Sequence, residues 1–198
     1  MKTVFWIAIA AMTFSNSALA AESGEWLVRA GPYMVSPKSD NGDLVNVDDS
    51  VGLGFNFTYR FTPNWAIEVL AAAPFTHDIE LIGGPRVGET KHLPPTVSVQ
   101  YHFATDSKFH PYVGAGVNYT LFFDEKAVGP LAGSELSLDD SFGLAAQLGA
   151  DIDLNETWFL NIDLRYIKIE TDATLDGSPL TIAKIDPFVY GIAIGTRF

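Results

Sequence analysis

Eight charged side chains of this sequence fall in segments where apolar and polar residues alternate. They are four arginines and four carboxylates: Arg29, Arg60, Glu68, Asp151, Asp153, Asp163, Arg165 and Arg197. A period of two puts alternate residues on one face of a strand, so these charges share their face with glycines and amides. If that face is enclosed, opposite charges must pair, because an unpaired buried charge is far costlier than a paired one. The set predicts a salt-bridge network that closes an interior, with gating of polar permeation as the alternative role.

The segment "VGLGFNFTYRF", residues 51–61, shows the alternation most clearly. Its bulky apolar residues fall on one face of a strand, and its glycines, Asn56, Thr58 and Arg60 fall on the other. The same pattern predicts eight strands, at residues 25–34, 50–61, 64–73, 95–103, 109–123, 141–154, 157–169 and 185–198. Each is long enough to contain the ~9–11 tilted residues with which a strand crosses a bilayer.

The connections between these strands differ in length. Tight turns at 62–64, 104–108 and 155–157 alternate with long connections at 35–49, 74–94, 124–140 and 170–184. We therefore predict an all-β fold, an eight-stranded antiparallel transmembrane β-barrel with short periplasmic turns and long extracellular loops. Its bulky face meets lipid and its small, polar face lines the lumen. The alternative is a soluble β-sandwich or lipocalin-like barrel, but such a fold needs a more highly charged exterior than this glycine-rich face.

The N-terminus has the pattern of an export signal. Lys2 is followed by the short apolar run "VFWIAIAAMTF", and Ala18 and Ala20 form an A-x-A cleavage pattern. This predicts a signal peptide at residues 1–20, removed on export, and a single barrel domain at residues 21–198. The sequence has no cysteine, so no disulfide is expected. Its formal net charge of −12 argues against a nucleic-acid partner.

The C-terminus ends in "YGIAIGTRF", with apolar residues at alternate positions up to a terminal aromatic. This ending resembles the signal by which the outer-membrane assembly machinery recognises its substrates. We expect Tyr190, Ile192, Ile194 and Phe198 to form that signal.

Several stretches together resemble a known family. "EVLAAAPF", "KHLPPT" and "PYVGAGVNYT" are rarely met in one chain, and further matching stretches extend the resemblance over residues 26–198. The chain resembles the outer membrane protein W (OmpW) family, small eight-stranded barrels of the outer membrane of Gram-negative bacteria. The resemblance implies a narrow barrel with a hydrophobic pocket that opens outward and takes part in the passage of small hydrophobic molecules. The partners it implies are a small hydrophobic ligand, outer-membrane lipid and lipopolysaccharide.

Eight strands enclose room for side chains or one small ligand, not for a wide water channel. The inward positions near the outer strand ends are apolar, namely Tyr33, Leu70, Phe122, Ile167 and Ile169, and the charges lie below them. We therefore predict an apolar pocket or gate above a polar floor. Pro74, Pro94 and Pro95 cannot donate to the ladder, so we predict a lateral opening to the bilayer there. The alternative is that these prolines only end strands and shape loops.

Two other classes of function stay open. A barrel without transport could serve as a structural protein or as a receptor for adhesion, phage or bacteriocin attachment, because loops on rigid scaffolds often carry recognition. A lipid-modifying enzyme is less favoured, since His77 and His92 have no serine at a spacing that requires pairing. The four histidines are also too scattered for a zinc site. We expect no catalytic residue, metal or cofactor.

Overall fold

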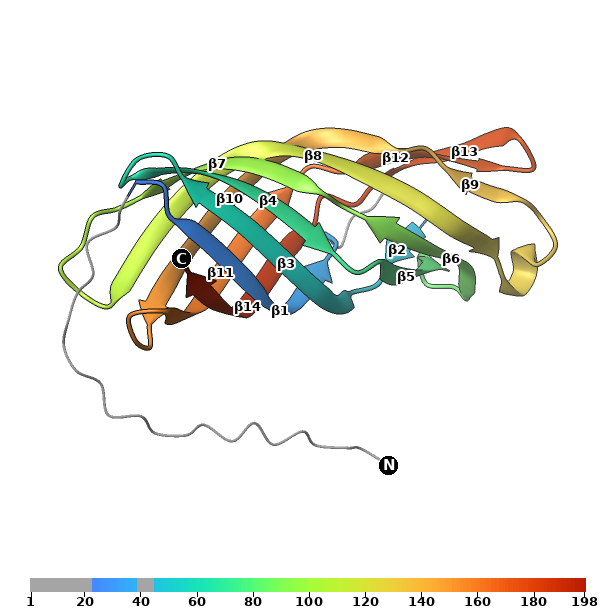
Figure 1. The fold of residues 1–198 in the computed structure, drawn as a ribbon. Helices are drawn as coiled ribbons and strands as arrows, with labels where there is room; N and C mark the ends of the chain where they lie inside the picture. Colours follow the sequence, from blue (N-terminus) through green and yellow to red (C-terminus); the bar gives the residue numbers. More distant parts are fainter. Residues whose placement is uncertain (1–22, 39–44) are drawn as a thin grey trace, which may run out of the picture.

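The chain forms a β-barrel whose wall continues at one end into a second section of strands (Figure 1). The computed structural model describes residues 23–38 and 45–198, so the predicted signal peptide at residues 1–20 lies outside the described part. The strands are β1 Trp26–Ser36, β2 Val45–Val47, β3 Ser50–Arg60, β4 Trp65–Ala72, β5 Phe75–Leu81, β6 Arg86–Leu93, β7 Thr96–His102, β8 Phe109–Ala127, β9 Leu136–Leu138, β10 Ser141–Asp153, β11 Trp158–Ile167, β12 Glu170–Leu175, β13 Ser178–Lys184 and β14 Phe188–Arg197. One short 3-10 helix, η1, covers Gly129–Leu131.

Eight of these strands close the barrel. Their order is β10-β11-β14-β1-β3-β4-β7-β8, and a further pairing of β10 with β8 completes the circle. Every neighbouring pair is antiparallel. The predicted eight-stranded antiparallel barrel is confirmed. Among the described residues, no helix has the length and apolar character to cross a membrane.

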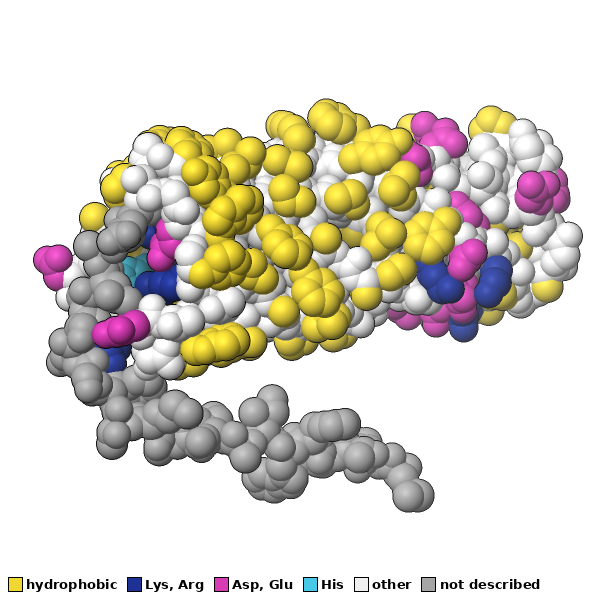
Figure 2. Space-filling model, in the orientation of Figure 1, with side chains coloured by type: hydrophobic (Ala, Val, Ile, Leu, Met, Phe, Trp, Pro, Cys, Tyr) yellow, Lys and Arg dark blue, Asp and Glu magenta, His cyan; other side chains and the backbone are white. Residues whose placement is uncertain are grey.

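The two faces of the barrel wall are oriented as the alternation predicts. On β3, Phe57 is 45% exposed while its neighbours Asn56 and Thr58 are fully buried in the lumen. Bulky apolar side chains cover the outside of the barrel as a broad belt (Figure 2). Aromatic pairs such as Trp26–Tyr59 and Trp65–Tyr101 lie at the short-turn end, where amphipathic rings suit a membrane interface. The belt is the surface that hydrocarbon covers.

The small residues of the inner face make room for large inward side chains. The ring of Tyr33 on β1 lies over Gly191 of β14, its own partner in the register, and over Gly54 of β3, which is paired with Gly31. A Cβ added at Gly54 would stand 2.5 Å from that ring, and one at Gly191 would stand closer still. In the same way, Phe159 lies over Gly195. Glycine on this face is therefore required by close packing.

This packing gives a first prediction. Gly191→Ala should lower the free energy of unfolding by about 1–3 kcal/mol, because its methyl group would overlap the Tyr33 ring in a filled interior. The measurement is the urea midpoint of the barrel refolded into phosphatidylcholine vesicles. Ile192→Val, one position along on the lipid-facing side, is the control and should change the midpoint less. Equal midpoints for Gly191→Ala and the unmodified protein would contradict the close packing.

The long connections carry strands of their own. β2, β5 and β6 extend one wall alongside the end of β8, while β9, β12 and β13 form a separate three-stranded sheet. We call this section, with the end of β8, the outer part. Its alternation is reversed: Phe75, His77 and Ile79 of β5 are buried inside, and the polar residues between them face out. Water rather than lipid surrounds this section, so its apolar side chains turn inward as in a soluble fold.

Candidate functional site

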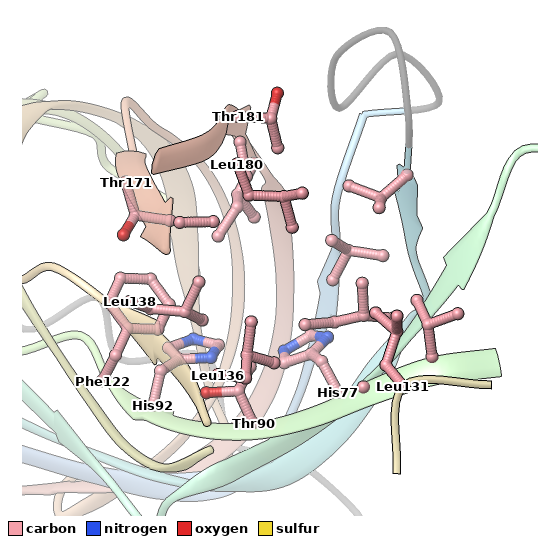
Figure 3. A pocket seen from close by; sticks show the side chains of 18 residues that line it. His77, Thr90, His92, Phe122, Leu131, Leu136, Leu138, Thr171, Leu180 and Thr181 are labelled. Atoms are coloured by element: carbon pink, nitrogen blue, oxygen red, sulfur yellow. The ribbon is translucent and has the colours of Figure 1, made fainter. Parts of the chain in front are cut away.

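An apolar pocket lies inside the outer part. Its cavity volume is about 50 Å³, more than the ~10–15 Å³ that a single water needs. β2, β5, β6, β8, β9, β12 and β13 all contribute to its wall (Figure 3). The lining residues are Val45, Val47, His77, Ile79, Val87, Gly88, Thr90, His92, Phe122, Leu131, Leu136, Leu138, Thr171, Ala173, Leu180, Thr181, Ala183 and Ile185.

A buried apolar cluster closes the pocket from below. Phe122, Leu138, Ala173 and Ile185 belong both to the pocket wall and to this cluster. The cluster continues downward through Tyr33, Val35, Phe75, Ala145, Ile167, Ile169 and Val189. Its members come from both sides of the barrel, so side chains fill the axis between the pocket and the polar lumen.

The five residues predicted for the pocket or gate occupy different places. Phe122 lines the pocket, whereas Tyr33, Ile167 and Ile169 are in the cluster beneath it. Leu70 is buried on β4 but belongs neither to the lining nor to the cluster. The prediction missed most of the lining, which comes from the long connections. The signal for it was present in short alternating runs such as "LVNV" and "ELSL".

Two histidines stand among the apolar side chains of the lining. His77 of β5 and His92 of β6 are each 2% exposed, and their rings stack with centroids 4.8 Å apart. His92 also stacks on Phe75, at 5.6 Å. His77 Nδ1 lies 2.5 Å from the backbone carbonyl oxygen of Asp48. The sequence suggested the two histidines only as weakly favoured catalytic residues, and in the structure they are part of the pocket lining.

Burial keeps both imidazoles neutral. It lowers the pKa of His92 to about 3, with the neighbouring His77 adding to the effect. It also lowers the pKa of His77, although the hydrogen bond to Asp48 and the carboxylates of Asp49, Asp48 and Asp78 act in the opposite direction. Because β5 and β6 stand above the belt, these shifts arise from protein packing and not from lipid.

This neutrality gives a second prediction. In protein carrying ¹⁵N-labelled histidine, the ring nitrogens of His92 should keep the shifts of a neutral imidazole at pH 5, where an ordinary histidine with a pKa near 6.5 is mostly protonated. His77 should begin to protonate only below that ordinary value. Spectra of His77→Phe and His92→Phe assign the signals. Titration of both rings near pH 6.5 would show that water reaches them freely.

The predicted charged residues form ion pairs in the lumen below the cluster. Arg29 binds Asp151 through Nε at 3.0 Å and Nη2 at 2.7 Å, and its Nη1 lies 3.5 Å from Glu68. Arg165 binds the other oxygen of Glu68 at 2.8 Å and Asp163 at 2.6 Å. All five side chains are at most 2% exposed. Glu68 thus bridges the two arginines.

The remaining charges pair nearer the short-turn end. Arg197 and His110 both bind Asp153, and Arg60 pairs with Glu25 at 3.6 Å. Glu25 was not among the predicted residues. It precedes β1, and the register of β1 with β3, in which Trp26 opposes Tyr59, places it beside Arg60. Amide and hydroxyl side chains complete the network. Gln147 donates to Glu68 and Asp163, Tyr112 donates to Asp163, and Asn161 donates to Asp151.

The barrel ladder is interrupted where the apolar belt meets the outer part. The last pair between β4 and β7 is Leu70 with Thr96, and the first pair between β5 and β6 is Phe75 with His92. Residues 71–74 and 93–95 lie between these pairs, outside the paired registers of β4–β7 and β5–β6. We call this interruption the wall gap. Its outer edge is formed by His92, which also lines the pocket.

The three predicted prolines lie at the wall gap but differ in their backbone contacts. Ala73 donates to the Leu53 carbonyl of β3 at 2.8 Å, and the Pro95 carbonyl accepts from Tyr119 of β8 at 3.1 Å. Pro74 and Pro94 lie among the residues between the paired registers, and the Pro94 carbonyl accepts from the Thr96 hydroxyl at 3.1 Å. Neither Pro74 nor Pro94 has an N–H to offer across the gap. The function of the gap as an opening remains a prediction.

The predicted assembly signal lies on the outside of the last strand. Tyr190, Ile192 and Ile194 of β14 are 45–58% exposed, and Phe198 just beyond it is 73% exposed. All four face the lipid side of the wall, next to β1, to which β14 pairs. Their recognition by the assembly machinery remains a prediction.

Comparison with known proteins places the chain among outer-membrane barrels. A model described as the OmpW family matches residues 22–198. The chain is 44% identical to outer membrane protein W of Vibrio cholerae, over 100% of this chain and 99% of that protein. It is 28% identical to the dibenzothiophene metabolism operon protein PahQ of Pseudomonas aeruginosa, over 90% of each. The crystal structure of the outer membrane protein OprG from Pseudomonas aeruginosa superimposes with a TM-score of 0.80, at 35% identity, over 90% of this chain and 98% of that one.

Proposed function

Because this chain belongs to the OmpW family, a family of Gram-negative outer-membrane β-barrels, we propose that it passes small hydrophobic molecules from outside into the outer membrane. The molecule enters the apolar pocket of the outer part, meets the closed lumen below, and leaves sideways through the wall gap. The observation that carries this proposal is the position of the pocket, directly above a sealed axis and beside the gap.

The lumen supports a sideways route because it offers no place for an apolar molecule. Arg29, Arg165 and their carboxylates are buried and paired with one another, so a molecule passing between them would have to break several ion pairs. An apolar molecule could not replace those contacts, and each separated charge would be left desolvated. The route along the barrel axis is therefore closed to hydrophobic molecules, because side chains occupy it and because separating the ion pairs costs free energy.

The wall gap supports the exit. A closed ladder holds its strands together through backbone hydrogen bonds, and Pro74 and Pro94 remove two donors from the point where such bonds would form. Alanine side chains at 71–73 leave little bulk there. The name of the relative PahQ associates that protein with the metabolism of dibenzothiophene, an apolar aromatic compound. The apolar lining of the pocket in this chain suits molecules of the same class, apolar aromatic compounds.

The proposal is tested by comparing uptake with conductance. Cells with and without the protein are given the apolar fluorescent probe N-phenyl-1-naphthylamine, and the purified barrel is placed in a planar bilayer for current recording. We expect faster probe uptake together with little ionic current, because ion pairs fill the lumen. Absence of any uptake effect would refute the proposal and favour the structural or receptor role. Lipid turnover by the purified barrel would instead indicate an enzyme.

A further inference from the structure

The pocket contains two polar atoms that nothing in the described structure satisfies. His77 Nε2 and His92 Nε2 are buried and have no hydrogen-bond partner among residues 23–38 and 45–198. The two rings lie close together on the same side of the pocket, within a lining that is otherwise apolar except for three threonines (Figure 3). Buried ring nitrogens nearly always have a hydrogen-bond partner in folded proteins. Two such nitrogens without a partner in one cavity therefore suggest a ligand group that forms a hydrogen bond with each of them.

The contact of His77 with Asp48 fixes which proton it carries. The Asp48 carbonyl oxygen can only accept, so Nδ1 must carry the hydrogen that is donated to it. In a neutral imidazole the other nitrogen then has a free lone pair. Burial lowers the pKa of His77 and so maintains this neutral form. His77 Nε2 is therefore an acceptor that requires a donor from the pocket.

His92 complements this acceptor. Its ring is stacked 4.8 Å from that of His77, and no carbonyl or carboxylate contact in the described structure fixes its tautomer. With its hydrogen on Nε2 it is a donor beside the His77 acceptor. The threonine hydroxyls of Thr90 and Thr171 are already committed to backbone carbonyls, of Lys91 at 3.3 Å and of Asp139 at 2.6 Å. The hydroxyl of Thr181 points away from the two rings (Figure 3). The histidine pair is thus the part of the lining where two buried polar atoms have no partner among the described residues.

We propose that the pocket selects hydrophobic molecules that end in a hydroxyl group, such as long-chain alcohols. The hydroxyl hydrogen is donated to His77 Nε2, and the hydroxyl oxygen accepts from His92 Nε2–H, while the apolar body lies against Leu138 and Ile185. A pure hydrocarbon leaves both nitrogens unpaired, and an ether or ketone satisfies only His92. This inference rests on the proposed function, because it names the class of molecule that the same pocket takes.

The test compares 1-octanol with n-nonane, which match in size and differ in the hydroxyl. The full barrel, with ¹⁵N-labelled histidine and ¹³C-labelled methyl groups, is held in nanodiscs of dimyristoyl phosphatidylcholine, and each compound is titrated. Octanol should move the His77 Nε2 resonance upfield, as expected when a lone pair accepts a hydrogen bond, and nonane should not. Octanol should also bind roughly three- to tenfold more tightly than nonane, the usual range for one net hydrogen bond.

Two variants test whether the preference for a hydroxyl group depends on His77. His77→Phe keeps a ring of similar shape and should lower the ratio of the two affinities, because the hydroxyl hydrogen loses its acceptor and only the bond from His92 remains. Thr76→Val removes a hydroxyl from the outward face of β5, next to His77 in the chain but outside the pocket lining, and should leave the ratio unchanged. The ¹⁵N titration of the unmodified barrel needs no variant, so it decides the question even if His77→Phe does not fold.

The outcomes separate this inference from the function on which it rests. If both compounds shift the methyl signals of Leu138 and Ile185 with equal affinity, and the ring nitrogens do not respond, the hydroxyl preference is refuted and the pocket function stands. If neither compound shifts those methyl signals, the pocket does not bind such molecules and both proposals fail.

Discussion

Replacing Arg29 with methionine is expected to lower the free energy of unfolding by about 3–5 kcal/mol, the usual loss when one member of a buried ion pair is removed. Arg29 is fully buried and is the cation that holds Asp151. Without it, Asp151 loses the guanidinium group that binds it, and Glu68 and Asp163 are left with Arg165. Methionine retains much of the side-chain volume, so the loss reports charge and hydrogen bonding and not an empty space.

The measurement is urea unfolding of the barrel in phosphatidylcholine vesicles, followed by tryptophan fluorescence. Arg86→Met is the matched control. Arg86 binds Asp78 at 2.7 Å and Glu89 at 2.5 Å, but its side chain is 40% exposed on the outer part. Exposed pairs contribute about 0–1 kcal/mol, so this change should have little effect. Similar losses for Arg29→Met and Arg86→Met would contradict a buried network in the lumen.

Replacing Phe122 with aspartate is expected to reduce uptake of an apolar probe by roughly tenfold or more. Phe122 belongs both to the pocket wall and to the cluster beneath it, so the change puts a carboxylate where the molecule must rest. A charge in an apolar site attracts water and raises the free energy of an apolar occupant, and about 1.4 kcal/mol is enough for a tenfold effect. Initial rates of N-phenyl-1-naphthylamine uptake into cells measure it.

Two variants control for fold and for charge. Phe122→Leu keeps the pocket apolar and should retain most of the uptake. Ile82→Asp adds the same carboxylate to the exposed turn between β5 and β6, where Ile82 is 54% exposed, and should leave uptake unchanged. Full uptake by Phe122→Asp, in protein shown to be folded and present at equal amount, would remove the pocket from the proposed route.

The outer part was the main addition that the structure made to the predicted fold. The sequence contained its strands as short alternating runs, but in them the polar residues face out. Alternation reveals that two faces differ and does not reveal which one is enclosed. In β3 the apolar face meets lipid, and in β5 it meets the pocket, although both runs look alike in the sequence. Which face of a strand is enclosed depends on whether lipid or water surrounds the strand.

The sequence by itself determined the eight barrel strands, their lipid-facing and lumen-facing sides, and the kinds of charge enclosed. These follow from local rules, because a side-chain period of two and the length of a turn act within a few residues. Only the tertiary structure decided that Arg60 pairs with Glu25, that Pro74 and Pro94 lie at one gap, and that His77 stacks on His92. Such contacts depend on strand register and on how the barrel closes, which bring together residues distant in the chain.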